Sequence, residues 1–136
     1  MKAFPFALLL LLAINPSLTR AAEGTKTSPS IHIKNVGVEE FAELTAAHTN
    51  VVLDVRTARE YAAGHIPGAT NMDISAPDFE KKLTELDKSK TYLVHCAGGV
   101  RSARACKMME KLSFTNLVNL EPGFKGWEKA GKPVEK

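Results

Sequence analysis

The sequence predicts an α/β fold, with a small, mainly parallel, five-stranded sheet and helices on both of its faces. Short apolar runs of the kind found in buried parallel strands recur along residues 31–136. Segments with a helical pattern lie between these runs. Such alternation is typical of a domain in which each helix carries the chain from one parallel strand to the next.

The expected strands are short and mostly apolar, and they cover 31–33, 51–55, 69–72, 92–95 and 117–120. The expected helices follow them in turn, at 38–47, 58–63, 77–86, 102–112 and 124–130. Thr57 and Glu60 have the spacing of a capping box at the start of the second helix. Ser75 is expected to cap the third helix, which Pro77 opens.

The first 21 residues have the layout of a secretory signal peptide. Lys2 precedes an apolar stretch at 4–14, and small residues end the segment. A bilayer core needs about 20 apolar residues, so this stretch predicts export, to the periplasm in a bacterium and otherwise to the outside, without stable membrane insertion after cleavage. The alternative is an uncleaved membrane anchor. Residues 22–30 are polar and read as a flexible leader, and residues 31–136 form the predicted domain.

Cleavage at this position would leave 115 of the 136 residues, which suffices for one domain with one core. It removes Lys2 and Arg20 and no acid, taking the basic residues from 18 to 16 against 15 acidic ones, a net charge of +1. The basic balance of the whole chain is therefore a poor argument for a nucleic-acid partner, and none is expected.

Cys96 is the residue most indicative of chemistry. It follows an apolar strand and precedes Gly98, Gly99 and a predicted helix, so loop and helix amides should point at its sulfur and favour the thiolate. A helix dipole contributes only about 0.3 to 1 kcal/mol, and loop amides must supply much of the stabilisation. Cys106 lies about two helical turns beyond the loop, too far for a disulfide with Cys96, and is expected to be a small buried hydrophobe.

Four residues separate Cys96 from Arg101, so the loop closes over six residues. The Cys-x5-Arg loop of cysteine-dependent phosphatases is one residue longer, and a smaller ring of amides holds a smaller guest. The segment Cys-Ala-Gly-Gly-Val-Arg-Ser at 96–102 is similar to the active-site loop of a single-domain rhodanese, in the rhodanese-like sulfurtransferase family. The resemblance extends to Leu-Asp-Val-Arg at 53–56, Gly-His-Ile-Pro-Gly-Ala at 64–69 and, more weakly, Gly-Phe-Lys-Gly-Trp at 123–127.

This resemblance implies a sulfurtransferase with Cys96 as the nucleophile. The thiolate would attack the outer sulfur of a small anionic donor such as thiosulfate, and a thiophilic acceptor such as cyanide, a thiol or a protein would then remove the sulfur from the persulfide. No metal or organic cofactor is needed. The backbone amides expected to bind the anion belong to Ala97, Gly98, Gly99 and Val100. Many rhodaneses have a basic residue where this chain has Ala97, so the identity of the donor stays open.

Arg101 has two interpretations: it binds the anionic donor, or it forms a structural ion pair with an acid such as Glu60. Arg104, one turn later, is expected to be a solvated surface charge. Asp54 and Arg56 could support the site, although tying loops together through buried hydrogen bonds is the favoured interpretation. Ser102 is a further supporting residue.

Two histidines are expected to have no direct catalytic role. His65 is interpreted as fixing its loop. His95 precedes Cys96 on a strand, and neighbours on a strand point to opposite faces, so His95 should not deprotonate the thiol.

Two other functions remain open at this point. One is a cysteine-dependent phosphatase or arsenate reductase of related fold, which the short loop and the lack of an obvious leaving-group acid disfavour. The other is a non-catalytic module that carries sulfur or binds a partner.

Overall fold

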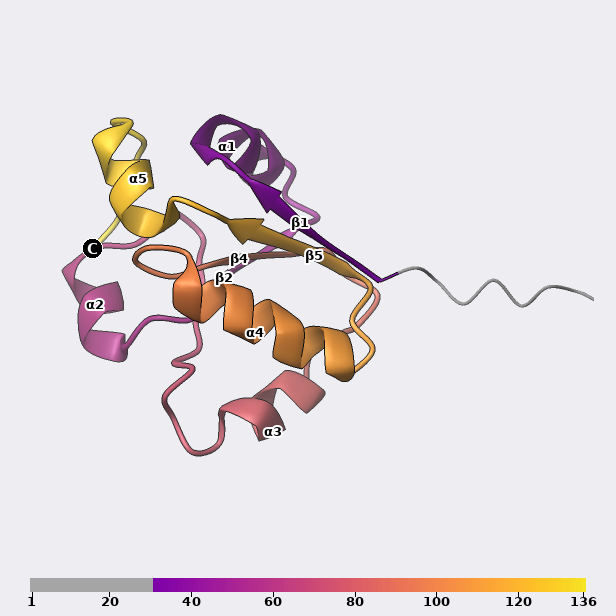
Figure 1. The fold of residues 1–136 in the computed structure, drawn as a ribbon. Coiled ribbons are helices and arrows are strands. Elements are labelled where there is room, and N and C mark those ends of the chain that lie inside the picture. Colours follow the sequence, from indigo (N-terminus) through magenta and orange to yellow (C-terminus); the bar gives the residue numbers. More distant parts are fainter. Residues whose placement is uncertain (1–30) are drawn as a thin grey trace, which may run out of the picture.

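A single sheet of five parallel strands lies at the centre of the computed structural model, which describes residues 31–136 (Figure 1). The strand order is β1-β5-β4-β2-β3. The predicted α/β fold is therefore confirmed, with a sheet that is parallel throughout. The predicted signal peptide (1–21) and leader (22–30) lie outside the described residues.

The strands are β1 (His32–Val36), β2 (Val51–Asp54), β3 (Thr70–Asn71), β4 (Tyr92–His95) and β5 (Asn116–Leu120). β4 has β2 on one side and β5 on the other, and all four of its residues are buried. Its carboxyl end therefore lies in the middle of the sheet, where parallel α/β sheets place their ligands. β1 is an exposed edge strand and is longer than the predicted 31–33. The prediction ended too early because polar Lys34 and Asn35 interrupt the apolar pattern, whereas the strand continues to Val36.

The helices are α1 (Val38–Ala46), α2 (Ala58–Ala63), α3 (Phe79–Thr84), α4 (Val100–Lys111) and α5 (Gly123–Lys129). In Figure 1, α1 and α5 lie on one side of the sheet and α3 and α4 on the other. No helix among residues 31–136 combines the length and the apolar character that crossing a membrane requires.

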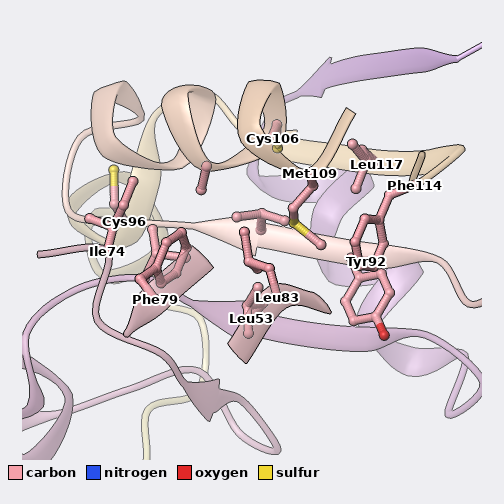
Figure 2. Close-up of a cluster of buried hydrophobic side chains, with 13 residues drawn as sticks. Leu53, Ile74, Phe79, Leu83, Tyr92, Cys96, Cys106, Met109, Phe114 and Leu117 are labelled. Atoms are coloured by element: carbon pink, nitrogen blue, oxygen red, sulfur yellow. The ribbon is translucent and has the colours of Figure 1, made fainter. Parts of the chain in front are cut away.

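Each face of the sheet has its own apolar core. The core beneath α3 and α4, drawn in Figure 2, includes Leu53, Tyr92, Phe114 and both cysteines. The core beneath α1 and α5 consists of Val36, Phe41, Val52, Ile66, Ala69, Leu93, Val118, Leu120, Phe124 and Trp127. Alternate residues of β4 enter different cores, as the two-residue period of a strand requires.

Two predicted helix starts were wrong by two residues each. α3 begins at Phe79 rather than Pro77, and Ser75 does not cap it, because the Ser75 amide and hydroxyl both donate to Asp73 (2.8 and 2.6 Å). α4 begins at Val100, two residues earlier than predicted, because Gly99 turns the chain directly into the helix. The predicted capping box of Thr57 and Glu60 is confirmed at the start of α2.

Candidate active site

Cys96 lies immediately after β4, between the sheet and the first turn of α4 (Figure 2). The Gly99 amide donates to its Sγ at 3.1 Å, and the Ser102 Oγ lies 3.3 Å from the same atom. Cys96 is 1% exposed and Ser102 is fully buried, so the thiol sits beneath the loop, away from bulk water. Loop and helix thus converge on one sulfur atom.

The environment of Cys96 favours its thiolate form. Burial alone raises the pKa of this thiol, because it disfavours the anion. Hydrogen bonds from the Ser102 hydroxyl and from the backbone amides of Ser102, Gly98 and Gly99 outweigh that effect, and the net pKa lies below the ordinary value. Cys106 shows the contrast: it lies in the apolar core, as predicted, and burial raises its pKa to about 12.

The shape of the loop depends on two glycines with left-handed backbone. Gly99 has a φ of +93°, and a Cβ there would lie 2.1 Å from the Glu121 carbonyl oxygen. Gly123, the first residue of α5, has a φ of +65°, and its Cβ would lie 2.4 Å from the Ala97 carbonyl oxygen. Both positions therefore exclude a side chain, and they let Glu121, which follows β5, and the start of α5 lie tightly against the loop.

The start of α5 holds the loop through its backbone. The Phe124 amide donates to the Cys96 carbonyl at 2.8 Å, and the Lys125 amide donates to the Ala97 carbonyl at 3.1 Å. The sequence did not predict this role of Gly123. The available signal was the Pro122-Gly123 pair, one residue after the end of β5, which is typical of a tight turn.

Arg101 forms a two-pronged ion pair with Glu60, in which both N–O distances are 2.9 Å. The hydrogen bond from Arg101 is the main cause that holds the pKa of Glu60 down at about 2. The same carboxylate also accepts from Thr57, so the pair joins the first turn of α4 to that of α2. The structure therefore contains the ion pair that was one of the two interpretations of Arg101.

Asp54 and Arg56 form a buried pair, and Arg56 also donates to the Gly64 carbonyl at 2.8 Å. The Arg56 guanidinium lies 4.1 Å from the centre of the Phe124 ring. Because Phe124 belongs to the core beneath α1 and α5, this pair lies across the sheet from the Cys96 sulfur. The geometry fits the loop-tying interpretation of the two residues.

The histidines lie as the sequence predicted. His95 is fully buried on the opposite face of the sheet from Cys96, against Phe41 and Phe124. Burial lowers its pKa to about 4, so the ring is neutral at physiological pH. His65 stacks on Tyr61, and its Nδ1 lies 3.0 Å from the Tyr61 carbonyl, which fixes the loop before β3.

A cavity of about 270 Å³ opens beside the loop. Ala97 lines it, together with Arg56, Glu60, Ala63, Gly64, Phe124, Lys125 and Glu128. Its position beside the residue that follows Cys96 gives a small molecule a place next to the loop. Within residues 31–136, no group of three or more His, Cys, Asp and Glu side chains is arranged to hold a metal ion.

Replacing Ser102 with alanine is expected to raise the pKa of Cys96. The substitution removes the hydroxyl 3.3 Å from Sγ, and a hydrogen bond to a charged group contributes about 1.5 kcal/mol or more. The thiolate population below the pKa should then fall about tenfold. Activity that needs the thiolate is lost as the pH falls through the pKa, so Ser102→Ala moves this loss to higher pH.

Thiolate absorbance measured against pH tests this expectation. Burial raises the pKa of Cys106 to about 12, so this thiol does not interfere, and Cys96→Ser provides the baseline. An unchanged titration curve for Ser102→Ala would contradict the assignment of this hydroxyl as a donor to the sulfur.

The sequence of this chain is similar to those of known proteins. A family model described as "Rhodanese-like domain" matches residues 37–130. The putative sulfurtransferase YtwF of Bacillus subtilis is 35% identical over 104 residues, which are 76% of this chain and 98% of YtwF. The putative sulfur carrier protein YrkF of the same organism is 30% identical over 96 residues, 70% of this chain, and the chain spans about half (51%) of YrkF.

A solved structure shows the same fold. The crystal structure of a rhodanese-related protein from Thermoplasma volcanium aligns with a TM-score of 0.67 and 30% sequence identity. The alignment covers 75% of this chain and 97% of that one. Sequence and structure comparisons therefore agree on the domain type.

Proposed function

The chain belongs to the rhodanese-like domain family, and on this premise we propose that it is a sulfurtransferase that carries sulfur on Cys96. The observation that carries the proposal is the set of hydrogen bonds on Sγ: the Gly99 amide and the Ser102 hydroxyl both lie within reach of one buried sulfur. Hydrogen-bond donors that already point at the anion need not reorient during the reaction. The same donors serve the thiolate before the reaction and the persulfide after it.

The first half-reaction forms the persulfide. The Cys96 thiolate attacks the outer sulfur of thiosulfate, a new S–S bond forms, and the S–S bond of the donor breaks. The electron pair of that bond leaves with sulfite, so one negative charge enters with the thiolate and one remains on the persulfide. The amides of Gly98 and Gly99 stabilise that charge.

The second half-reaction regenerates the thiolate. An acceptor such as cyanide attacks the outer sulfur of the persulfide, and the electron pair of the S–S bond returns to Cys96. The product is thiocyanate when cyanide is the acceptor. Arg101 keeps its ion pair with Glu60 throughout, with about a third of its side chain exposed, and so holds the start of α4 in place beside the loop.

Mass spectrometry of the protein after exposure to thiosulfate tests the proposal. We expect one sulfur atom on the peptide that contains Cys96, and we expect cyanide to remove it as thiocyanate. Cys106→Ala is the matched control and should gain sulfur as the unaltered protein does, because Cys106 lies in the core. Cys96→Ser is the blank and should gain none.

Two outcomes would contradict the proposal. Hydrolysis of an aryl phosphate ester, without sulfur uptake from thiosulfate or a polysulfide, would identify the phosphatase alternative. A persulfide that neither cyanide nor a small thiol removes would identify a carrier, the role that the name of YrkF suggests for that relative.

We also propose that residues 1–21 direct export of the protein, since Lys2 and the apolar stretch at 4–14 have the layout of a signal peptide. The mass of the protein isolated from its native cells should then lack this segment. Recovery of the full-length mass from the cytosolic fraction alone would contradict export.

A further inference from the structure

One exposed stripe runs along α4 from the Cys96 loop. Val100, Arg104, Lys107 and Lys111 are spaced i, i+4, i+7 and i+11, which places all four on one side of the helix. All four are exposed. At about 1.5 Å per residue, the stripe is about 16 Å long.

The stripe carries an excess of positive charge. Lys107 lies 3.3 Å from Glu110, whereas Arg104 and Lys111 form no ion pair within residues 31–136. Two of its three cations are thus uncompensated, although the chain without its first 21 residues carries a net charge of only +1. Positive charge is concentrated on this side of α4.

The end of the stripe at the loop is apolar. Val100 is 81% exposed and is one of only two large apolar side chains exposed in the described part of the chain. It directly follows Gly99, whose amide donates to the Cys96 sulfur. An exposed apolar side chain therefore lies at the reactive loop, and the three cations follow along the helix away from the loop.

Resting on the proposed function, we infer that this stripe docks an acidic protein whose thiol accepts the sulfur from Cys96. Acidic side chains of the partner face Arg104, Lys107 and Lys111, and an apolar residue beside its thiol contacts Val100. Charge complementarity of this kind raises association rates and aligns the partner. A nucleic acid fits less well, because the stripe has no aromatic side chain on which a base could stack.

The transfer step needs no further reactant. The partner's thiol attacks the outer sulfur of the Cys96 persulfide anion, and the S–S bond of that persulfide breaks. The electron pair returns to Cys96 as thiolate, and the proton of the attacking thiol ends on the transferred sulfur. One negative charge is present before and after the step.

Two synthetic peptide thiols serve as probes for this surface. Both have one cysteine beside a leucine, and they differ only in whether the remaining residues are glutamates or glutamines. The test variant is Arg104→Glu/Lys111→Glu. The matched control is Lys90→Glu/Lys129→Glu, which changes the net charge by the same amount as the test variant. Lys90 lies before β4, and Lys129 lies in the last turn of α5.

At low salt, the rate of sulfur transfer to the glutamate peptide should fall about tenfold in the test variant and stay nearly unchanged in the control variant. Transfer to the glutamine peptide and to cyanide should be unaffected in both. The difference should disappear near 1 M salt, where the Debye length is about 3 Å.

Each other outcome has a distinct meaning. Equal transfer to the two peptides from a normally formed persulfide would overturn the docking inference and leave the proposed function intact. Failure to form the persulfide would instead overturn the proposed function. Tighter binding of a labelled RNA oligomer than of the glutamate peptide, abolished in Arg104→Glu/Lys111→Glu, would replace the acidic protein with a nucleic acid.

Discussion

Replacing Gly123 with alanine is expected to destabilise the fold and to slow persulfide formation at Cys96. A left-handed φ of +65° costs a residue with a side chain about 1 to 2 kcal/mol. The new Cβ would also lie 2.4 Å from the Ala97 carbonyl oxygen and 2.6 Å from the Gly98 nitrogen, so the backbone of the loop must move. Overpacking adds about 1 to 3 kcal/mol, and we expect a total loss of about 3 kcal/mol.

The same displacement acts on the sulfur. The Gly98 and Gly99 amides lower the pKa of Cys96 from within this loop, and a catalytic group displaced by about 1 Å loses about 100-fold in rate. We therefore expect the rate of persulfide formation in Gly123→Ala to fall by about that factor. Urea unfolding and the initial rate of sulfite release from thiosulfate measure the two effects.

Gly131→Ala separates the loop contact from backbone strain. Gly131 lies just beyond the other end of α5 with a φ of +70°, but its Cβ would meet nothing within 4 Å. This control should lose about 1 kcal/mol and keep full activity. Equal rates in the two variants would show that α5 does not shape the loop.

Gly123 also illustrates which features of the site could not be predicted from the sequence. The strand, glycine loop and helix around Cys96 are consecutive in the chain, and their order alone predicted a thiol surrounded by amides. The Pro122-Gly123 pair indicates a turn, but the contact of Gly123 with Ala97 joins segments far apart in the sequence, and no local pattern shows which segment the turn will meet. The α/β fold was predictable because the alternation of strands and helices is a local pattern in the sequence. The order of the strands in the sheet depends on contacts between distant segments and was not predictable.

Smaller errors arose where polar side chains had more than one possible partner. Ser75 was predicted to cap α3, yet it pairs with Asp73 in a local turn. Lys34 and Asn35 made β1 read as shorter than it is, because an edge strand tolerates exposed polar residues. Arg101 had two interpretations, and only the folded chain brings Glu60 close enough to form the ion pair.

Asp54→Ala is expected to destabilise the fold by about 3 to 5 kcal/mol, more than Gly123→Ala, because it leaves the Arg56 guanidinium buried and unpaired. The Asp54 carboxylate is fully buried and accepts from the Arg56 backbone amide and from its guanidinium at 2.7 to 3.1 Å. Without it, the guanidinium retains one hydrogen bond, to the Gly64 carbonyl. Urea unfolding measures the change.

Two controls identify the cause. Asp78→Ala removes an exposed ion pair with Lys82, worth at most about 1 kcal/mol, and should change stability little. Asp54→Leu/Arg56→Met removes both buried charges, so it should be more stable than Asp54→Ala, since no unpaired ion remains. A double variant less stable than Asp54→Ala would contradict this explanation.

Activity then separates a structural role from a role in the site. Asp54 and Arg56 lie across the sheet from the Cys96 sulfur, and the Ser102, Gly98 and Gly99 donors do not depend on them. The pH dependence of sulfite release from thiosulfate by the folded fraction of Asp54→Leu/Arg56→Met should therefore match that of the unaltered protein. A shifted pH profile in fully folded molecules would mean that this pair acts on the thiol through the sheet, with His95, whose Nε2 lies 3.7 Å from the Asp54 carboxylate, as the connecting residue.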